Sequence, residues 1–236
     1  MITLHGMGSP NVVKIYIALE ELEYPYTVRP VDVFAAQQFD AEFLRLNPLA
    51  KVPVIEDPDG PGGKPITVFE SGAILLYLAD KAQRLLPADA AARCEAIQWL
   101  MVQMTNLGPM AGQLVHFKRF AAAGNDYALS RYATQVHRLF ALYDQRLAAR
   151  PWVGGEDYGI ADIAAFPWLR SAEMLLGSAH SDFANVARWT ATIAARPAVV
   201  RALAAVDRVR AETTAFDKAA PGNLDRLFGR GAFAAA

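Results

Sequence analysis

The chain is predicted to fold as an α/β domain followed by an all-helical domain. Short strand-like and helix-like segments alternate over residues 1–83, and the segments after residue 91 all have helical periodicity. Between them, residues 87–91 are rich in proline and alanine, which is typical of a linker. At 236 residues the chain is long enough for two small domains.

The first domain, residues 1–83, is expected to contain four strands and three helices in the order βαβαββα, the thioredoxin-like arrangement. Ser9 followed by Pro10 is typical of a helix N-cap with proline at the first helical position. The Gly- and Pro-rich stretch 57–63 predicts a hairpin with an enlarged loop. In chain order we expect a strand at 2–5, a helix at 10–23, a strand at 26–33, a short helix at 41–46, strands at 52–56 and 66–69, and a helix at 70–83.

The second domain, residues 91–236, is expected to be helical throughout, with residues 205–236 as its C-terminal extension. Gly108-Pro109 lies inside the first long helical segment and predicts a kink there. Asp162 follows Gly159 at the spacing of a capping box, with glycine at the cap. The predicted helices are 93–117, 127–149, 160–176, 183–195 and 197–210.

Composition excludes several classes of protein. A net charge of −1 provides no field to attract nucleic acid or an acidic membrane. The apolar runs are shorter than a membrane span, and the N-terminus lacks the features of a signal peptide. Cys94 is the only cysteine, so no intrachain disulfide is possible and a reducing, cytoplasmic location is expected. The four histidines have no ligand spacing, so we expect no metal.

The segment Thr67–Leu75 carries the strongest chemical signal. Glu70 and Ser71 lie where a strand gives way to a helix, and a helix start exposes unpaired N–H groups that can hold a carboxylate. The Glu70 carboxylate can in addition hold an ammonium group. The γ-glutamyl end of glutathione carries both charges on one carbon. Together with the strand opened by Lys51-Val52-Pro53, this Pro…Glu-Ser arrangement resembles the glutathione transferase superfamily.

Ser9 and Asn11 are candidates for holding a thiolate. Free cysteine has a pKa near 8.5, and hydrogen-bond donors at a helix start would lower it. The residues alone favour a structural interpretation, in which Ser9 only caps the helix and Asn11 only occupies its first turn, because such caps are common. The resemblance reverses this preference.

Within the superfamily, the chain resembles the bacterial Nu class, which is related to the yeast nitrogen-regulating prion protein. The resemblance runs from residue 1 to about residue 205 and includes Ser9-Pro10-Asn11, with serine where threonine is usual. It implies a glutathione-dependent disulfide reductase that holds two glutathione molecules, or glutathione disulfide, without an essential tyrosine or cysteine. The other segments that carry it are Asn47–Pro53, Phe69–Leu78, Leu107–Gln113 and Pro151–Tyr158.

The resemblance also implies a set of binding residues. Gln38 would contact the glycyl end of one glutathione, and Lys51 would face a glycyl carboxylate. Val52 would offer its backbone to the cysteinyl unit, which requires a cis Val52–Pro53 bond. Glu70 and Ser71 would hold the γ-glutamyl group, and Arg131 of the helical domain would reach a glutathione carboxylate. For Lys51 and Arg131, the structural alternative is a solvated surface charge.

The resemblance implies thiol–disulfide exchange with weaker conjugation or peroxidase activity, in a homodimer. Glutathione is the co-substrate and no metal is needed; the second substrate is a small disulfide or an electrophile. One alternative is a conventional transferase that conjugates electrophiles or reduces peroxides with a single glutathione. Another is a non-catalytic glutathione-binding regulator. A third, a ligand binder without affinity for glutathione, is disfavoured by Lys51, Glu70 and Ser71.

Overall fold

The structure, a computed structural model, describes residues 1–234, which form two compact units. The N-terminal unit comprises Met1–Ile74 and residues 200–234, and the helical unit comprises Leu75–Val199. The boundaries fall inside two helices, α3 (Ser71–Ala82) and α10 (Pro197–Glu212). Residues 205–234, which belong to the predicted C-terminal extension of the helical domain, group with the N-terminal unit.

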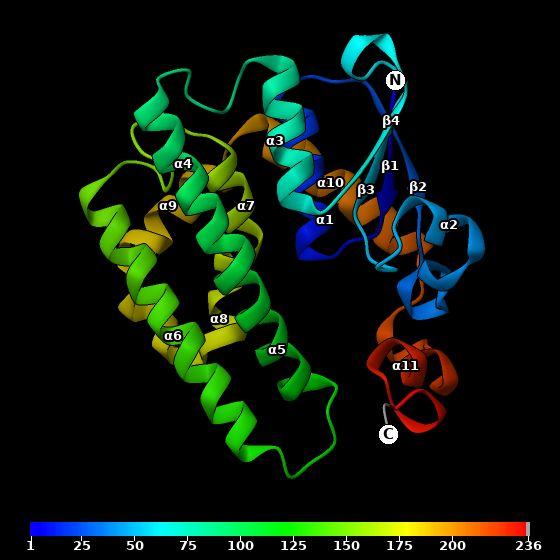
Figure 1. Cartoon of the computed structure of the whole chain (residues 1–236). Helices are drawn as coiled ribbons and strands as arrows, with labels where there is room; N and C mark the ends of the chain where they lie inside the picture. The colour runs from blue at the N-terminus through cyan, green and yellow to red at the C-terminus, as the bar shows by residue number, and fades with distance from the viewer. Residues whose placement is uncertain (235–236) are drawn as a thin grey trace. The chain divides into compact units, whose positions relative to one another are not determined.

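The N-terminal unit is built on a four-stranded mixed sheet with the strand order β2-β1-β3-β4 (Figure 1). β1 and β2 pair in parallel, whereas β3 is antiparallel to both β1 and β4. Parallel neighbours need a crossover, and α1 (Pro10–Glu21) supplies it. The predicted thioredoxin-like order is confirmed. The strands are β1 (Ile2–Gly6), β2 (Tyr26–Pro30), β3 (Val54–Asp57) and β4 (Ile66–Phe69), and α2 spans Ala41–Leu46.

β2 ends at Pro30, three residues before the predicted end at residue 33. Asp32 is the reason. Its carboxylate accepts hydrogen bonds from the N–H groups of Phe34 and Ala35, each at 3.1 Å, and so caps a short 3-10 turn at 33–35. A local side-chain cap thereby prevails over the strand preference of the apolar residues around it.

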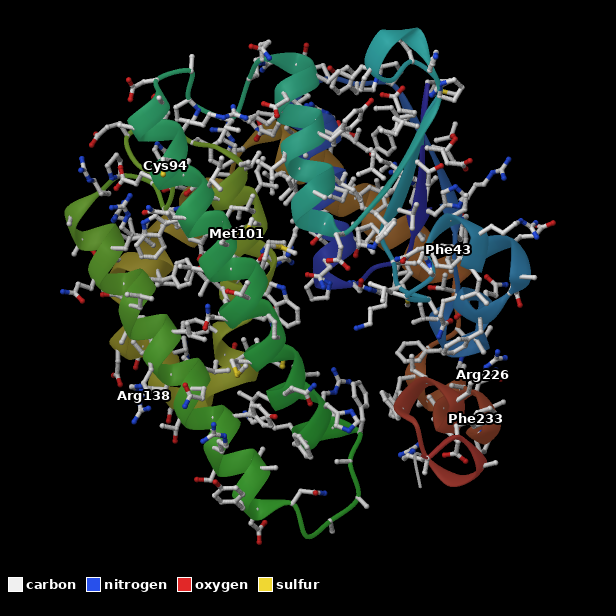
Figure 2. The ribbon with its side chains drawn as sticks, in the orientation of Figure 1. Phe43, Cys94, Met101, Arg138, Arg226 and Phe233 are labelled. Carbon is white, nitrogen blue, oxygen red and sulfur yellow. The ribbon has the colours of Figure 1, made fainter. Side chains whose placement is uncertain are left out.

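The segment after α10, residues 213–228, packs on the turn that follows β2, and we call it the C-terminal clamp. It contains α11 (Pro221–Phe228), which contacts residues 33–35. The stretch 32–39 that the clamp contacts includes Gln38. Its contacts are Thr214 N–H to Asp32 Oδ2 at 2.7 Å, Asn223 Nδ2 to Phe34 O at 3.3 Å, and the guanidinium of Arg226, which is labelled in Figure 2, at 4.3 Å from the centre of the Phe39 ring.

We expect Asp32→Ala to release the clamp. Burial raises the pKa of Asp32, but hydrogen bonds from Thr214, Ala35 and Phe34 outweigh it and hold the pKa below its usual value. A bond to a charged group contributes roughly 1.5–3 kcal/mol, so amide exchange over 213–228 should accelerate at least about tenfold. Hydrogen–deuterium exchange measures this. Asp40→Ala is the control, since Asp40 is exposed and makes no capping bond. Unchanged exchange in Asp32→Ala would contradict the assignment.

The helical unit contains the predicted long helices with two differences. The expected kink takes the form of a π-helical turn at Gln103–Leu107, immediately before Gly108-Pro109. Residues 160–176 are not one helix: the first part ends at Leu169, because Ser171 leaves the helical conformation with a ψ of 23°. The helices are α4 (Ala90–Val102), α5 (Gly108–Arg119), α6 (Asp126–Ala149), α7 (Ile160–Leu169), α8 (Ala172–Leu176) and α9 (Ala184–Ala194).

None of the helices within residues 1–234 is both long enough and apolar enough to span a membrane.

Candidate functional site

Three loops meet at one edge of the N-terminal sheet. β3 runs antiparallel to β1 and β4, so the beginning of β3 lies beside the ends of the other two strands. The register is explicit: Val54 of β3 pairs with His5 of β1 on one side and with Phe69 of β4 on the other. The segments that continue from these positions contain most of the predicted site residues, namely Ser9 and Asn11 after β1, Lys51–Pro53 before β3, and Glu70–Ser71 after β4.

Ser9 and Asn11 lie at the start of α1. Ser9 occupies the N-cap position, and its backbone oxygen accepts hydrogen bonds from Val12 N and Val13 N, both at 3.0 Å. Its hydroxyl makes no capping hydrogen bond, contrary to the side-chain cap that its sequence position suggested. Asn11 is half-buried in the first turn. At this helix start, unpaired N–H groups and the positive end of the helix dipole favour a negatively charged ligand atom.

The loop before β3 is held by Asn47, the first residue of the segment Asn47–Pro53, for which we predicted no role of its own. Asn47 is buried, donates from Nδ2 to Lys51 O at 2.7 Å and accepts from Leu49 N at 3.0 Å. The Val52–Pro53 bond is cis, as expected. The Lys51 side chain is exposed. Asn47 thus fixes the backbone from which Lys51 and Val52 project.

Glu70 and Ser71 form the junction between β4 and α3. Glu70 is exposed and has a φ of +68°, a left-handed conformation that costs a non-glycine residue energy and is common at functional sites. Ser71 begins α3 and is buried. Its Oγ accepts a hydrogen bond of 3.2 Å from Lys14 Nζ. An acidic side chain, a hydroxyl and a buried amine therefore come together at this helix start.

Lys14 is the second residue that sequence analysis missed. It is completely buried on α1, within the apolar run Val12–Leu19. Burial lowers the pKa of Lys14 to about 7, and the Glu70 carboxylate partly opposes this shift. The available signal was a single lysine interrupting a continuous apolar stretch, because buried lysines are rare unless they are paired.

Gln38 and Arg131 lie outside the three loops that contain the other predicted site residues. Gln38 is 1% exposed, and within residues 1–234 neither its amide nitrogen nor its amide oxygen has a hydrogen-bond partner. A buried amide of this kind is unusual and has unused capacity to bind a polar group. Arg131 is an exposed residue of α6 in the helical unit. The roles expected for these two residues stay predictions.

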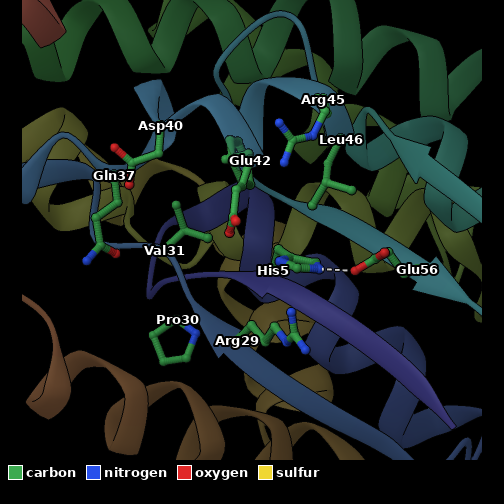
Figure 3. Close-up of a pocket in the computed structure, with 11 residues that line it drawn as sticks. His5, Arg29, Pro30, Val31, Gln37, Asp40, Glu42, Arg45, Leu46 and Glu56 are labelled. Carbon is green, nitrogen blue, oxygen red and sulfur yellow. Dashed lines mark hydrogen bonds and ion pairs between the residues drawn. The ribbon is translucent and has the colours of Figure 1, made fainter.

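A separate pocket of about 380 Å³ lies in the N-terminal unit (Figure 3). His5 Nε2 and Glu56 Oε2 approach to 2.6 Å on its wall. Arg29 and Arg45 line it together with carboxylates, so it has no strong preference for one sign of charge. None of the predicted site residues lines it.

The N-terminal unit contributes no thiol to the site. Cys94, the only cysteine of the sequence, is exposed on α4 in the helical unit. Within residues 1–234, no group of three or more His, Cys, Asp or Glu side chains could hold a metal ion. Thiol chemistry at the three-loop edge would therefore use a thiol brought by a ligand.

The fold and the three-loop edge define a glutathione transferase, and the chain belongs to that family. Residues 1–80 match the family described as Glutathione S-transferase, N-terminal domain, and residues 99–197 match Glutathione S-transferase, C-terminal domain. A curated relative is the disulfide-bond oxidoreductase YfcG of Escherichia coli. It is 42% identical over 205 residues, which cover 86% of this chain and 94% of that protein.

Solved structures agree with this assignment. A glutathione transferase family member from Pseudomonas fluorescens, with two glutathione molecules bound, matches with a TM-score of 0.82 and 45% identity over 86% of this chain and 92% of that chain. A glutathione transferase from Pseudomonas putida, with one glutathione disulfide bound per subunit, matches with a TM-score of 0.82 and 41% identity over 86% and 90% of the two chains. The resemblance to the bacterial Nu class is confirmed.

Proposed function

We propose that the protein is a glutathione-dependent disulfide reductase that works by thiol–disulfide exchange between bound glutathione molecules. One observation carries the proposal: the start of α1, with Ser9 and Asn11, lies at the same sheet edge as Glu70 and Ser71, while Cys94 lies in the other unit. The N-terminal unit therefore has groups suited to the thiolate and to the γ-glutamyl end of a glutathione, and it contains no cysteine. The oxidoreductase YfcG and the glutathione-bound relatives support the same conclusion.

The reaction takes place in two exchanges. A first glutathione, held as thiolate by Asn11 and Ser9, attacks one sulfur of the substrate disulfide. A mixed disulfide forms and one substrate thiolate leaves. The thiolate of a second glutathione then attacks the glutathione sulfur of the mixed disulfide. Glutathione disulfide forms and the second substrate thiolate leaves. Two glutathione molecules are oxidised and one disulfide is reduced, with no oxidised state of the protein.

The protein contributes thiolate stabilisation, proximity and neutralisation of the peptide carboxylates. In this proposal Glu70 and Ser71 hold the γ-glutamyl group, and Val52, followed by Pro53, offers its backbone to the cysteinyl unit. Lys51 faces a glycyl carboxylate, Gln38 contacts the glycyl end of one glutathione, and Arg131 of the helical unit reaches a glutathione carboxylate. We also propose, from the family, a homodimer located in the cytoplasm.

A conventional conjugating transferase is the main alternative, because it would use the same thiolate. We expect reduction of 2-hydroxyethyl disulfide, coupled to glutathione reductase, to be fast and conjugation of 1-chloro-2,4-dinitrobenzene to be slow in the same preparation. Conjugation needs one glutathione and an apolar acceptor site, whereas disulfide exchange needs two glutathiones. The ratio of the two rates therefore distinguishes the alternatives. The opposite ratio would reject the reductase and leave Gln38 and Arg131 without a second glutathione to bind. Glutathione binding without turnover of either substrate would indicate a regulatory protein.

A further inference from the structure

The buried side chain of Lys14 costs folding free energy, and the mechanism proposed above assigns it no role. Its side chain is completely buried, and its Nζ reaches the Oγ of Ser71 at the first residue of α3. Isolated buried charges are strongly disfavoured, so a buried lysine that remains in a chain commonly has a partner or a function. It lies three residues after Asn11, a spacing that puts two helix residues on the same face.

The geometry fixes the direction of the hydrogen bond when Lys14 is charged. An ammonium group has three donors and no acceptor, so Ser71 Oγ must accept from it. The Ser71 hydroxyl proton is then directed to another acceptor. A carboxylate at the start of α3 is such an acceptor, and the ammonium behind Ser71 adds positive charge to that of the helix N-terminus. A neutral amine could instead accept the Ser71 proton and withdraw it from the ligand.

We propose that Lys14 is a positioning residue of the glutathione site: its amine becomes protonated as the glutamyl carboxylate binds, and the resulting ammonium orients the Ser71 hydroxyl toward that carboxylate. This inference rests on the proposed function, because it assigns the glutamyl end to Glu70 and Ser71. The Lys14 ammonium adds a buried positive charge next to Ser71, and its titration makes ligand binding depend on pH.

The charged groups around Lys14 support this coupling. Burial lowers the pKa of Lys14 to about 7, and the Glu70 carboxylate opposes this shift. On α10, Arg208 and Glu212 act on Tyr16, and Arg201 pairs with Glu20 at 2.7 Å. Arg210 pairs with Asp207 at 3.1 Å and donates to Gly8 O at 3.3 Å. Without ligand, Lys14 therefore loses its proton just above neutral pH. A bound carboxylate nearby raises its pKa again, so binding takes up a proton.

Calorimetric titration with S-methylglutathione tests the inference, because this ligand has no thiol to ionise. At pH 7.5–8, titration in two buffers of different ionisation enthalpy should show uptake of roughly half a proton or more per site. Affinity should fall severalfold, and at most about tenfold, for each pH unit above 7.5. Binding without proton uptake would overturn the role of Lys14 and leave the glutathione site intact. If the wild type binds no S-methylglutathione, both proposals are wrong.

Lys14→Met separates this role from a structural one. We expect affinity at pH 6.5 to fall at least about tenfold and proton uptake to disappear. The Tm should rise, because the folded-state pKa is lowered. The cost of burying the charge is complete below pH 7 and fades as pH rises toward 10.5, so the Tm gain should shrink over that range. Lys64→Met, at an exposed loop position, is the matched control and should change neither quantity. Lys14→Met with wild-type affinity and proton uptake would refute the proposal.

Discussion

Replacing Asn11 with alanine should lower glutathione-dependent disulfide turnover by at least about a hundredfold, the usual effect of removing one donor from a developing or stabilised anion. Asn11 lies in the first turn of α1, where its Nδ2–H₂ can donate to a bound sulfur beside the helix N-terminus. Without this donor the thiol pKa rises toward its free value, and less thiolate is present near neutral pH.

The pH profile separates this role from a loss of binding. In Asn11→Ala the rise of kcat/KM with pH should move to higher pH, and raising the pH should restore part of the rate. The thiolate absorbance of bound glutathione measures the same pKa directly.

Ser9→Ala is the matched variant and should lose much less activity. Ser9 shares the helix start, but a hydroxyl that makes no capping bond can be removed without disturbing α1. Equal losses in the two variants, or no loss in Asn11→Ala, would show that the donor assignment is wrong. Asn106→Ala, at an exposed position of the π-helical turn in the helical unit, controls for the loss of an amide elsewhere in the chain.

The order of the elements was predictable because the local signals agreed with the tertiary structure. The proline after Ser9 marks the start of α1, and the Gly/Pro-rich loop marks the β3–β4 hairpin. The errors come from features that periodicity does not contain. Asp32 ends β2 early by capping the next turn, and Ser171 interrupts what we predicted as one helix. The packing of the C-terminal clamp depends on contacts between residues about 180–190 positions apart, which no local pattern encodes.

The candidate site was predictable only where a short motif carries its own chemistry. Glu70-Ser71 at a strand-to-helix junction is such a motif, and antiparallel pairing through Val54 brings it beside Val52 and Pro53. Supporting residues are harder to find. Asn47 acts through its bond to Lys51 O, and Lys14 through its bond to Ser71 Oγ. Neither role follows from sequence spacing, because each partner comes from a different element of the fold.

A second large effect is expected in the helical unit, where Asp162→Ala should lower the free energy of unfolding by about 3–5 kcal/mol. Asp162 is completely buried at the start of α7 and accepts four hydrogen bonds. Alanine would leave these donors without an acceptor, and each buried group of this kind is expensive. The donors are Val153 N at 2.8 Å, Gly159 N at 3.2 Å, Trp189 Nε1 at 2.8 Å and the backbone N–H of Gly154.

Urea denaturation at pH 7.5 measures this loss of stability, because the contribution of Asp162 does not change with pH there. Burial raises the pKa of Asp162 to about 6, and hydrogen bonds from Val153, Trp189, Gly159 and Gly154 oppose the shift. Because the folded-state pKa is raised, the contribution of this group falls as pH rises from about 4 to 6 and is constant above that range.

Asp162→Asn should lose less, since an amide oxygen can still accept from Val153 and Trp189. Asp157→Ala, at an exposed neighbouring position, should change stability by no more than about 0.5 kcal/mol. A similarly small loss in Asp162→Ala would mean that the donors find other acceptors, and that the start of α7 does not depend on its cap.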